Sequence, residues 1–353
     1  MAGISMRELA DLLGVSTASV SVALRGKPGI SEETRKRILE EAHKHGYDMG
    51  RLSAPDCKGL VEIIDLTYRG NPNAPEDFLY YNQFLEYASR ELTGQGYQVS
   101  GPFSPSEPGF LSRPPADGGI VLGSSASTEQ LAQYQALEIP FVVTGISPEF
   151  FPANTVSHDN YSGIRTAVLY LKEMGHSCIG YLRSLQMTPG QEREQAWRYE
   201  ISRQGLVPGE FLDLSEGTGL ADPESILKYF HVWLEHNVPK ATAFLCDSDS
   251  LAAAFMRALR DRGYIPGRDI SVIGFDDMPF SALLEPPLTT IRTSEPELAL
   301  ASVQLLLHCM KHPGQPHWHI RIDTSLVERN TCQKPTGCDG QQTSASTENI
   351  IGR

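Results

Sequence analysis

Three short segments with the apolar spacing of helices occupy the first fifty residues. The first is predicted over residues 6–13, and its expected apolar face consists of Met6, Leu9, Ala10, Leu12 and Leu13. Ser5 and Glu8 form a capping-box pattern at its start. Gly14 predicts its end, because glycine readily takes the positive φ of a helix C-terminus. A short amphipathic helix followed by a tight turn is therefore expected.

Two further helices are predicted after this turn. Ser16 is a suitable N-cap for the second, which should run to about residue 24. Ser31 should cap the third, where Glu32 and Glu33 favour the positive end of the helix dipole, and Gly46 should end it. The residues expected to face inward are Val20, Ala23 and Leu24 in the second helix and Ile38, Leu39 and Ala42 in the third.

From Gly59 onward, short apolar runs alternate with longer segments of helical spacing. The runs expected to be strands are GLVEIIDL, YQVSG, GGIVLG, PFVVTG, NTVSHD, CIGYLRS, TAFLCD, DISVIGFDD and LTTIRT. The helical segments are expected at residues 80–95, 128–137, 161–174, 191–204, 223–236, 249–262 and 295–311. This alternation predicts βαβ units with parallel sheets covered by helices. Nine strands favour two such α/β subdomains.

The predicted organisation is an all-α head, a linker and an α/β body. The head covers residues 1–47, the linker 48–58 and the body 59–332. Residues 333–353 are polar without periodicity, which is typical of a disordered tail. Residues 1–58 carry nine Lys and Arg against eight Asp and Glu, whereas the remainder carries 21 against 35. If the head binds DNA, the acidic body should stay away from the phosphates.

Composition excludes several classes of protein. No segment approaches the roughly 20 apolar residues that span a bilayer, and the start of the chain lacks the pattern of a secretory signal. We therefore expect a cytoplasmic protein without membrane contact. The six cysteines are scattered singly, and Cys178 and Cys246 lie in apolar runs, which is typical of buried thiols in a reducing compartment.

The second helix has an unusual composition. Its sequence TASVSVAL is free of charge, and Ser16, Ser19 and Ser21 supply hydroxyls that can donate to phosphate oxygens. Small side chains would also let such a helix approach base edges in a groove. The alternative is a small-residue helix packed tightly against a neighbour, and the stretch alone favours neither. Three short helices with a glycine turn between the first two do match a helix-turn-helix.

The stretch MRELADLLGVSTASVSVALRGKPGISEETRKRILEEAHKHGY closely resembles the DNA-binding head of the LacI/GalR family of bacterial transcription regulators. The resemblance rests on Gly-Val-Ser at 14–16, Ser-Val-Ser-Val-Ala-Leu-Arg-Gly at 19–26, Ile-Ser at 30–31, Thr-Arg at 34–35 and His-Gly-Tyr at 45–47. It implies that Thr17, Ala18 and Val22 face bases. It also implies that Ser5, Met6, Ser16, Ser21, Arg25, Ser31 and Thr34 lie near the phosphate backbone.

The head departs from the family pattern at three places. Val22 replaces the usual arginine, which removes a bidentate contact to guanine but permits packing on a thymine methyl. Arg25 replaces the usual asparagine and can restore a phosphate or base contact. The segment YDMGRLSAPDCKG lacks the family's hinge pattern, so we expect a weak or absent hinge helix. Leu52 is the residue that would enter the minor groove, and a flexible linker is the alternative.

The resemblance continues through the body to about residue 332. The stretches VSHDNYSGIRTAVLYLKEMGHSCIGYL, AFLCDSDSLAAAFMRALRDRGYIPGRDISVIGFDD and PPLTTIRT carry it most strongly, and LVERNT resembles the closing strand. They imply a periplasmic-binding-protein-like fold of two α/β subdomains, with a ligand cleft between them. They also imply that the chain crosses between the subdomains near residues 159, 290 and 323.

Residues at strand ends are the expected cleft residues, because ligands of open α/β sheets bind outside the carboxyl ends of the strands. Asp247, Ser248 and Asp276 follow apolar runs, and Arg193 opens the helix after CIGYLRS. The resemblance implies that the arginine and Asp276 contact a polyhydroxylated or heterocyclic effector. It adds Tyr80, Tyr81 and Ser162 as residues lining the cleft, although the tyrosines are equally compatible with core positions.

Simpler roles compete with these assignments. Arg193 can form a surface ion pair with Glu192 or Glu194, and Asp249 is expected to be the N-cap of its helix. Asp277 is expected to be solvated or structural, and His158 and His176 are expected to be structural histidines.

The alternatives to a regulator are an enzyme and a sugar-binding protein. The four aspartates at 247, 249, 276 and 277 are compatible with a catalytic carboxylate pair or a magnesium site. No catalytic or nucleotide-binding motif accompanies them. We therefore expect no catalytic residues, no metal and no cofactor. The attached DNA-binding head disfavours a sugar-binding protein.

The sequence predicts a homodimeric repressor that binds double-stranded operator DNA under the control of a sugar, nucleoside or similar effector. A transcription regulator without any small-molecule effector is the remaining alternative.

Overall fold

The computed structural model describes residues 6–24, 30–45, 47, 57–66, 75–103, 116–124, 126–184, 188–214 and 223–335, with only the backbone described at residues 7, 18, 32 and 75–81. The chain divides into two compact units. One is Met1–Gly59 with Gly96–Gln98, and the other is Leu60–Gln95 with Val99–Arg353. We call the helical part of the first unit the head and the second unit the body.

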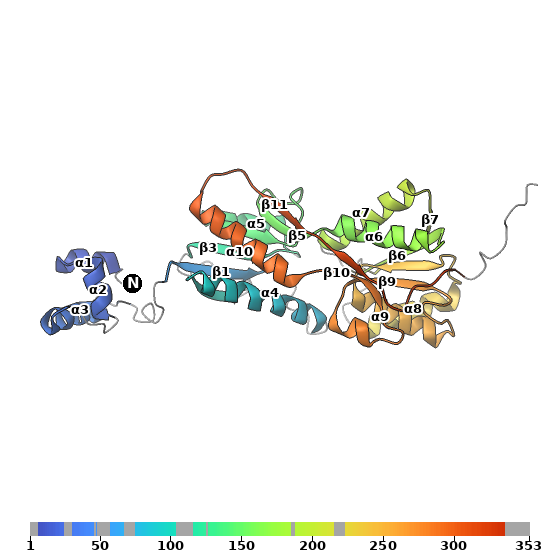
Figure 1. Cartoon of the computed structure of the whole chain (residues 1–353), viewed down its shortest axis with the longest axis horizontal. Helices are drawn as coiled ribbons and strands as arrows, with labels where there is room; N and C mark the ends of the chain where they lie inside the picture. Colours follow the sequence, from blue (N-terminus) through green and yellow to red (C-terminus); the bar gives the residue numbers. More distant parts are fainter. Residues whose placement is uncertain are drawn as a thin grey trace, which may run out of the picture. The chain divides into compact units, whose positions relative to one another are not determined.

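The head contains three helices, as the sequence predicts (Figure 1). They are α1 (Met6–Leu13), α2 (Thr17–Leu24) and α3 (Glu32–Lys44). Gly14 has a φ of 67°, and the N–H of Val15 donates to the carbonyl of Ala10, so the turn closes α1 as expected. The hydroxyl of Ser16 accepts from the N–H of Ser19, and that of Ser31 accepts from Thr34, which confirms both N-caps. Ser5 and Gly46 lie outside the described residues.

The three helices bury one small core. It consists of Leu9, Ala10, Val20, Ala23, Leu24, Ile38, Ala42 and Tyr47. Two expected core positions are wrong, because Leu12 is 55% exposed and Leu39 is 37% exposed. Successive helical residues are about 100° apart, and Leu39 therefore lies beside the stripe formed by Ile38 and Ala42. Two arginines add contacts between the helices: Arg37 donates to the carbonyl of Leu13, and Arg35 to that of Ala23.

The body contains two six-stranded sheets, which confirms the predicted α/β class. The first sheet has the order β11 (His319–Ile322), β5 (Asn154–His158), β4 (Phe141–Thr144), β3 (Gly118–Leu122), β1 (Leu60–Asp65) and β2 (Gln98–Phe103). The second has the order β12 (Ser325–Val327), β10 (Thr289–Arg292), β9 (Ser271–Asp276), β8 (Ala243–Cys246), β6 (Cys178–Arg183) and β7 (Val207–Asp213). Strand β12 pairs antiparallel with β10, whereas β3, β4, β8 and β9 pair in parallel with their neighbours.

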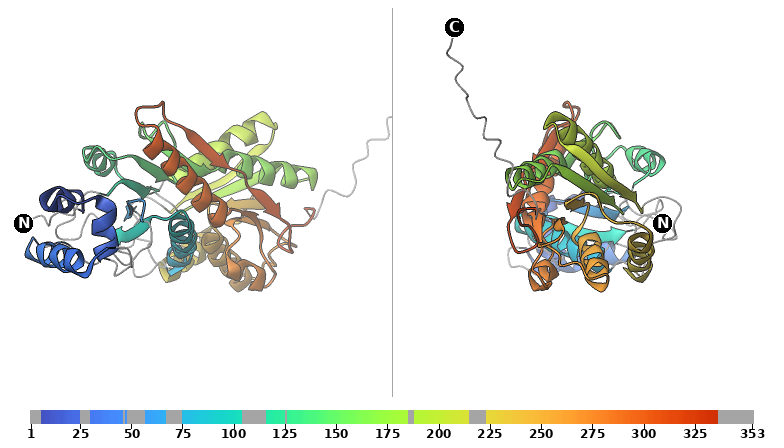
Figure 2. Two further views of the ribbon diagram at one scale, coloured as in Figure 1. Left: turned by 60° about the vertical axis from the view of Figure 1, so that its left-hand side comes forward. Right: turned by 90° about the vertical axis from the view of Figure 1, so that its right-hand side faces the viewer.

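The helices of the body follow the strands. They are α4 (Pro75–Gly94), α5 (Thr128–Gln135), α6 (Asn160–Glu173), α7 (Thr188–Arg203), α8 (Pro223–His236), α9 (Asp249–Asp261) and α10 (Glu295–Lys311), with the 3₁₀ helix η3 (Pro279–Leu283) after β9. Helices α4 and α10 lie side by side along the first sheet (Figures 1 and 2). Two apolar clusters pack against the second sheet, one with α8 and α9 and the other with α6 and α7. No helix within the described ranges is both long and apolar enough to cross a bilayer.

The chain passes between the two sheets three times. It leaves the first sheet after β5, returns between β10 and α10, and leaves again between β11 and β12. We call the part built on the first sheet the first subdomain and the part built on the second sheet the second subdomain. Every strand expected from the sequence is present, but two edge strands, β7 and β11, were not expected.

Candidate functional site

The carboxyl ends of the strands of both sheets meet at the junction of the subdomains. Residue Ser124 follows β3 of the first sheet, and its carbonyl accepts a hydrogen bond from the N–H of Thr188, which begins α7 beside the second sheet. Asp247 follows β8 and Asp276 ends β9 of the second sheet. In open α/β folds this edge is where ligands bind. A ligand-binding site is therefore expected at the junction of the two subdomains.

Arg193 on α7 is the centre of a buried hydrogen-bond network. Only 4% of the residue is exposed. Its Nε donates to the side-chain oxygen of Asn160 at 2.8 Å, and its Nη1 donates to the carbonyl of Asp247 at 2.5 Å. Its Nη2 donates to the carboxylate of Asp276 at 3.2 Å, and the guanidinium lies 3.6 Å from the ring centroid of Phe275. The alternative surface ion pair with Glu192 or Glu194 is therefore wrong.

The end of β9 has an unusual backbone. Asp276 and Asp277 have φ values of 109° and 55°, which side-chain-bearing residues rarely adopt. Such strain concentrates at functional sites. Burial raises the pKa of the Asp276 carboxyl, although the charge and hydrogen bond of Arg193 oppose the shift. Asp277 is ion-paired with Arg292 and Arg329, which confirms a structural role for it.

The segment after β8 places three neighbouring residues in different roles. The carboxylate of Asp247 is fully buried and accepts from the backbone N–H of Ser184 at 2.7 Å and from its hydroxyl at 3.1 Å. The N-cap of α9 is Ser248, whose hydroxyl accepts from the N–H of Leu251. The expectation that Asp249 is the N-cap is therefore wrong. A serine one position earlier has the extended backbone that a cap requires.

Asp249 instead links three elements inside the second subdomain. Its fully buried carboxylate accepts from the hydroxyl of Thr290 on β10, from that of Ser281 on η3 and from the N–H of Met278. Burial raises the pKa of Asp249 to about 7, and the charge of Asp276 acts in the same direction. The three hydrogen bonds lower it. The carboxylate is thus a structural acceptor rather than a metal ligand.

A polar hollow of about 610 Å³ lies beside the arginine network. The first subdomain lines it with Ser147, Glu149, Phe150 and Arg321, and the second with Tyr161, Thr188, Gln191, Glu192 and Gln195. Glu192 joins the hollow to the network, because its carboxylate accepts from the side-chain N–H of Asn160 at 2.6 Å. Burial raises the pKa of Glu192 against the effect of this hydrogen bond. Neither Asn160 nor Glu192 was predicted as a site residue.

The other predicted cleft residues are less informative. Ser162 lies on the first turn of α6, half-buried, where its N–H donates to the carboxylate of Asp159. Tyr80 and Tyr81 belong to α4, where only their backbone is described. Among the described residues, no three His, Cys, Asp or Glu side chains are grouped as a metal ion would require.

Two buried histidines have structural partners, as expected. His158 ends β5 at the first crossing, and its Nε2 accepts from the N–H of Ser294 at the second crossing. Burial lowers the pKa of His158 to about 4, while a hydrogen bond from the protonated ring to the carbonyl of Ser294 opposes the shift. His176 contacts the hydroxyl of Thr242 and the carbonyl of Gln333. The contacts of His158 with the Ser294 backbone join the first and second crossing strands.

Three of the eleven predicted DNA-binding residues are exposed on the head, and four others are half-buried. Ser16, Thr17 and Ser31 are exposed, and Ser21, Val22 and Thr34 are half-buried. Met6 is also half-buried and packs against the head core. Ser5, Arg25 and Leu52 lie outside the described residues, and only the backbone of Ala18 is described. The contacts of these residues with DNA stay a prediction.

Comparison with known proteins agrees with both parts. Residues 5–48 match the model of bacterial regulatory proteins of the lacI family, and residues 168–332 match a periplasmic binding protein-like domain. The HTH-type transcriptional regulator reg1 of Streptomyces lividans is 28% identical, covering 95% of this chain and 99% of the relative.

Solved structures share the fold. The lac repressor dimer bound to operator and the anti-inducer ONPF has a TM-score of 0.68 at 22% identity, covering 94% of this chain and 100% of that one. The complex of the transcriptional regulator CelR with cellobiose has a TM-score of 0.65 at 22% identity, covering 93% and 99%.

A helix-turn-helix head followed by a two-subdomain body of this kind defines a DNA-binding transcription regulator. The matched head and body identify the regulator more closely. The chain combines a head of the lacI family of bacterial regulatory proteins with a periplasmic binding protein-like domain, and its curated relatives are HTH-type transcriptional regulators.

We predict that Asp249→Ala lowers the free energy of unfolding by about 3 kcal/mol, because it leaves three buried donors without an acceptor. Urea unfolding followed by tryptophan fluorescence measures this change. The control is Asp261→Ala at the other end of α9, where an exposed ion pair with Arg257 is lost and the effect should stay below about 1 kcal/mol. Equal effects of the two substitutions would contradict the structural role of Asp249.

Proposed function

We propose that this regulator is a dimeric repressor whose affinity for operator DNA is controlled by a neutral, polyhydroxylated small molecule bound between the two subdomains. The observation that carries the proposal is the buried pair of Arg193 and Asp276 at the carboxyl ends of the strands. A buried pair with a strained backbone beside a polar hollow provides oriented donors and acceptors for hydroxyl groups.

The charges around the hollow favour a neutral effector. The nitrogens of Arg193 already donate to Asn160, Asp247 and Asp276. Among the described residues, the hollow adds the carboxylates of Glu149 and Glu192 against the guanidinium of Arg321. A phosphorylated ligand would meet this excess of carboxylates, whereas a neutral sugar or nucleoside would not. The cellobiose bound to CelR supports the sugar class.

The proposed effector-contacting residues are Tyr80, Tyr81, Ser162, Arg193, Asp247, Ser248 and Asp276, to which the hydrogen bonds of the network add Asn160 and Glu192. The proposed DNA-contacting residues are Ser5, Met6, Ser16, Thr17, Ala18, Ser21, Val22, Arg25, Ser31, Thr34 and Leu52.

The proposed divisions of the chain are the DNA-binding domain at residues 1–47, the linker at 48–58, the effector-binding and dimerisation domain at 59–332 and the tail at 333–353. We place the protein in the cytoplasm, because its proposed target is chromosomal DNA, and we assign it binding rather than catalysis.

Exposed apolar side chains in the second subdomain support the proposed dimer. Leu283 on η3 is 84% exposed, and Val238 after α8 is 77% exposed. Helix α9 packs against α8, and Arg260 on α9 donates to the carbonyl of Glu285 just beyond η3, so both elements flank α9. We infer that this face of the second subdomain, with its exposed Leu283 and Val238, forms the dimer interface. A two-fold dimer would present two heads to the two halves of a palindromic operator.

Asp276→Asn is expected to weaken effector binding at least a hundredfold while leaving operator affinity unchanged. Effector binding is measured by the rise in melting temperature across a panel of sugars and nucleosides, and operator affinity by fluorescence anisotropy. A ligand at a hundred times its Kd stabilises the protein by about 2.7 kcal/mol, and this stabilisation should disappear.

The control for this experiment is Arg198→Ala, which removes a guanidinium from the same helix as Arg193. Arg198 is half exposed and pairs with Glu194. This variant should respond like the unmodified protein. A normal effector response of Asp276→Asn would show that the effector binds elsewhere.

Val22→Arg is expected to change base preference at one position of each half-site, because arginine can form a bidentate contact with guanine. Selection from randomised operator half-sites measures the preference. Leu39→Arg adds the same charge at an exposed position of α3, so it should raise non-specific affinity without changing the preferred sequence. An identical preference in Val22→Arg and the unmodified protein would remove Val22 from the DNA-reading surface.

Leu283→Glu is expected to shift the protein to monomers in sedimentation velocity and to weaken operator binding at least tenfold, because a charge would be buried in the interface. Val207→Glu on the edge strand β7 is the control, since Val207 is also exposed, at 57%. A dimeric Leu283→Glu variant would contradict the proposed interface.

A further inference from the structure

The end of α10 and the loop that follows it contain an unusual concentration of histidines. Four of the ten histidines of the chain lie in residues 308–319, which read HCMKHPGQPHWH. A short tract rich in histidine is a compositional sign of metal binding. This tract belongs to neither the head nor the junction of the subdomains, so the regulatory function does not account for it.

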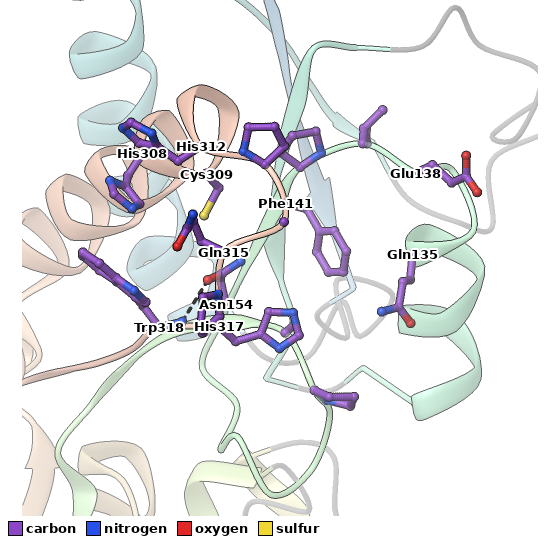
Figure 3. Close-up of a pocket in the computed structure, with 17 residues that line it drawn as sticks. Gln135, Glu138, Phe141, Asn154, His308, Cys309, His312, Gln315, His317 and Trp318 are labelled. Atoms are coloured by element: carbon purple, nitrogen blue, oxygen red, sulfur yellow. Dashed lines mark hydrogen bonds between the residues drawn. The ribbon is translucent and has the colours of Figure 1, made fainter.

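Part of the tract lines a hollow of about 320 Å³ in the first subdomain (Figure 3). His308, His312 and His317 line it together with Trp318 and residues of the opposite wall, which include Phe141 and Asn154. Phe141 begins β4 and Asn154 begins β5. The hollow therefore lies at the amino ends of these parallel strands, whereas the proposed effector site lies at the carboxyl ends.

Two of these histidines are next to each other at the end of α10, where His308 lies on the last turn and His312 is the C-cap. The ring centroids of His308 and His312 are 4.8 Å apart, and the N–H of His312 donates to the carbonyl of His308 at 3.0 Å. Figure 3 shows the two rings side by side at the end of the helix. Although His312 is the C-cap rather than a helical residue, its ring contacts that of His308, and histidines four positions apart bind zinc in other helices.

The position of His308 is fixed from its other side. Its ring stacks on Trp318 with 4.4 Å between centroids, and the backbone N–H of Trp318 donates to the side-chain oxygen of Asn154 at 2.9 Å. Within the part of the chain that the structure describes, no hydrogen bond involves the imidazole nitrogens of His308 or His312. By contrast, Nδ1 of His319 is 3.1 Å from the hydroxyl of Thr155. The first two imidazoles are therefore available as ligands.

We propose that His308 and His312 bind a divalent transition-metal ion such as Zn²⁺, with water in the remaining coordination positions. Imidazole nitrogens are ligands for zinc, nickel and copper. The carboxyl end of a helix carries partial negative charge, which favours a cation there. The described residues contain no group of three metal-binding side chains, so the site is a two-histidine site that keeps exchangeable water.

Calorimetric titration of the untagged, chelator-treated full-length protein with ZnCl₂ at pH 7.5 tests this site. We expect His308→Phe and His312→Gln each to weaken Zn²⁺ binding at this site at least tenfold, and the double variant to abolish it. His308→Phe keeps a ring that can stack on Trp318 but removes both nitrogens. It therefore separates ligation from packing.

His319→Gln is the matched control, because it removes a histidine of the same tract whose imidazole already faces Thr155. This variant should bind Zn²⁺ as the unmodified protein does, and the melting temperatures without metal should be similar in all variants. Unchanged Zn²⁺ affinity and stoichiometry in the double variant would overturn the proposal, and so would a loss of binding in His319→Gln equal to that in His312→Gln.

Discussion

The buried guanidinium of Arg193 needs acceptors from three separate segments of the chain. It is satisfied by Asn160 at the start of α6, by the carbonyl of Asp247 after β8 and by Asp276 at the end of β9. An unpaired buried charge would cost several kcal/mol, so these segments have to meet at this point. The same contacts place Asn160 and Asp276 at the junction with the other subdomain. The need to pair the buried charge of Arg193 therefore determines which polar groups are available in the proposed binding site.

The sequence predicted the elements whose own residues determine them. Continuous apolar runs such as GGIVL and AFLC predicted buried parallel strands, and glycine and serine signals predicted the helices of the head. Strand β7 has the sequence VPGEFLD, where proline and glycine obscure the pattern, and β11 has the half-exposed sequence HIRI. Both are edge strands, which need less apolar surface. Pairing with a neighbouring strand rather than local pattern determines them.

The site was predictable only in part, because its contacts are tertiary. Resemblance pointed to Arg193 and Asp276, but Asn160 and Glu192 have no local signal that distinguishes them from surface residues. Asp249 shows the same limit. Aspartate at a helix start usually caps the helix, and only the fold places Thr290 and Ser281 around its carboxylate. In the head, likewise, the chain position of Arg35 does not reveal its contact with the end of α2.

A change in the angle between the two subdomains requires a change in backbone conformation at the three crossings. The N–H of Asp159 donates to the carbonyl of Ile322, and His158 accepts from the N–H of Ser294, so the crossing strands are bonded to one another. An effector that bridges Arg193 and the first subdomain would favour one angle at these strands over another. The body begins at Leu60, which is also the first residue of β1 in the first subdomain. A displacement of that subdomain would therefore move the point at which the chain enters the body from the head. Differential binding to two such states is the physical requirement for control of DNA affinity.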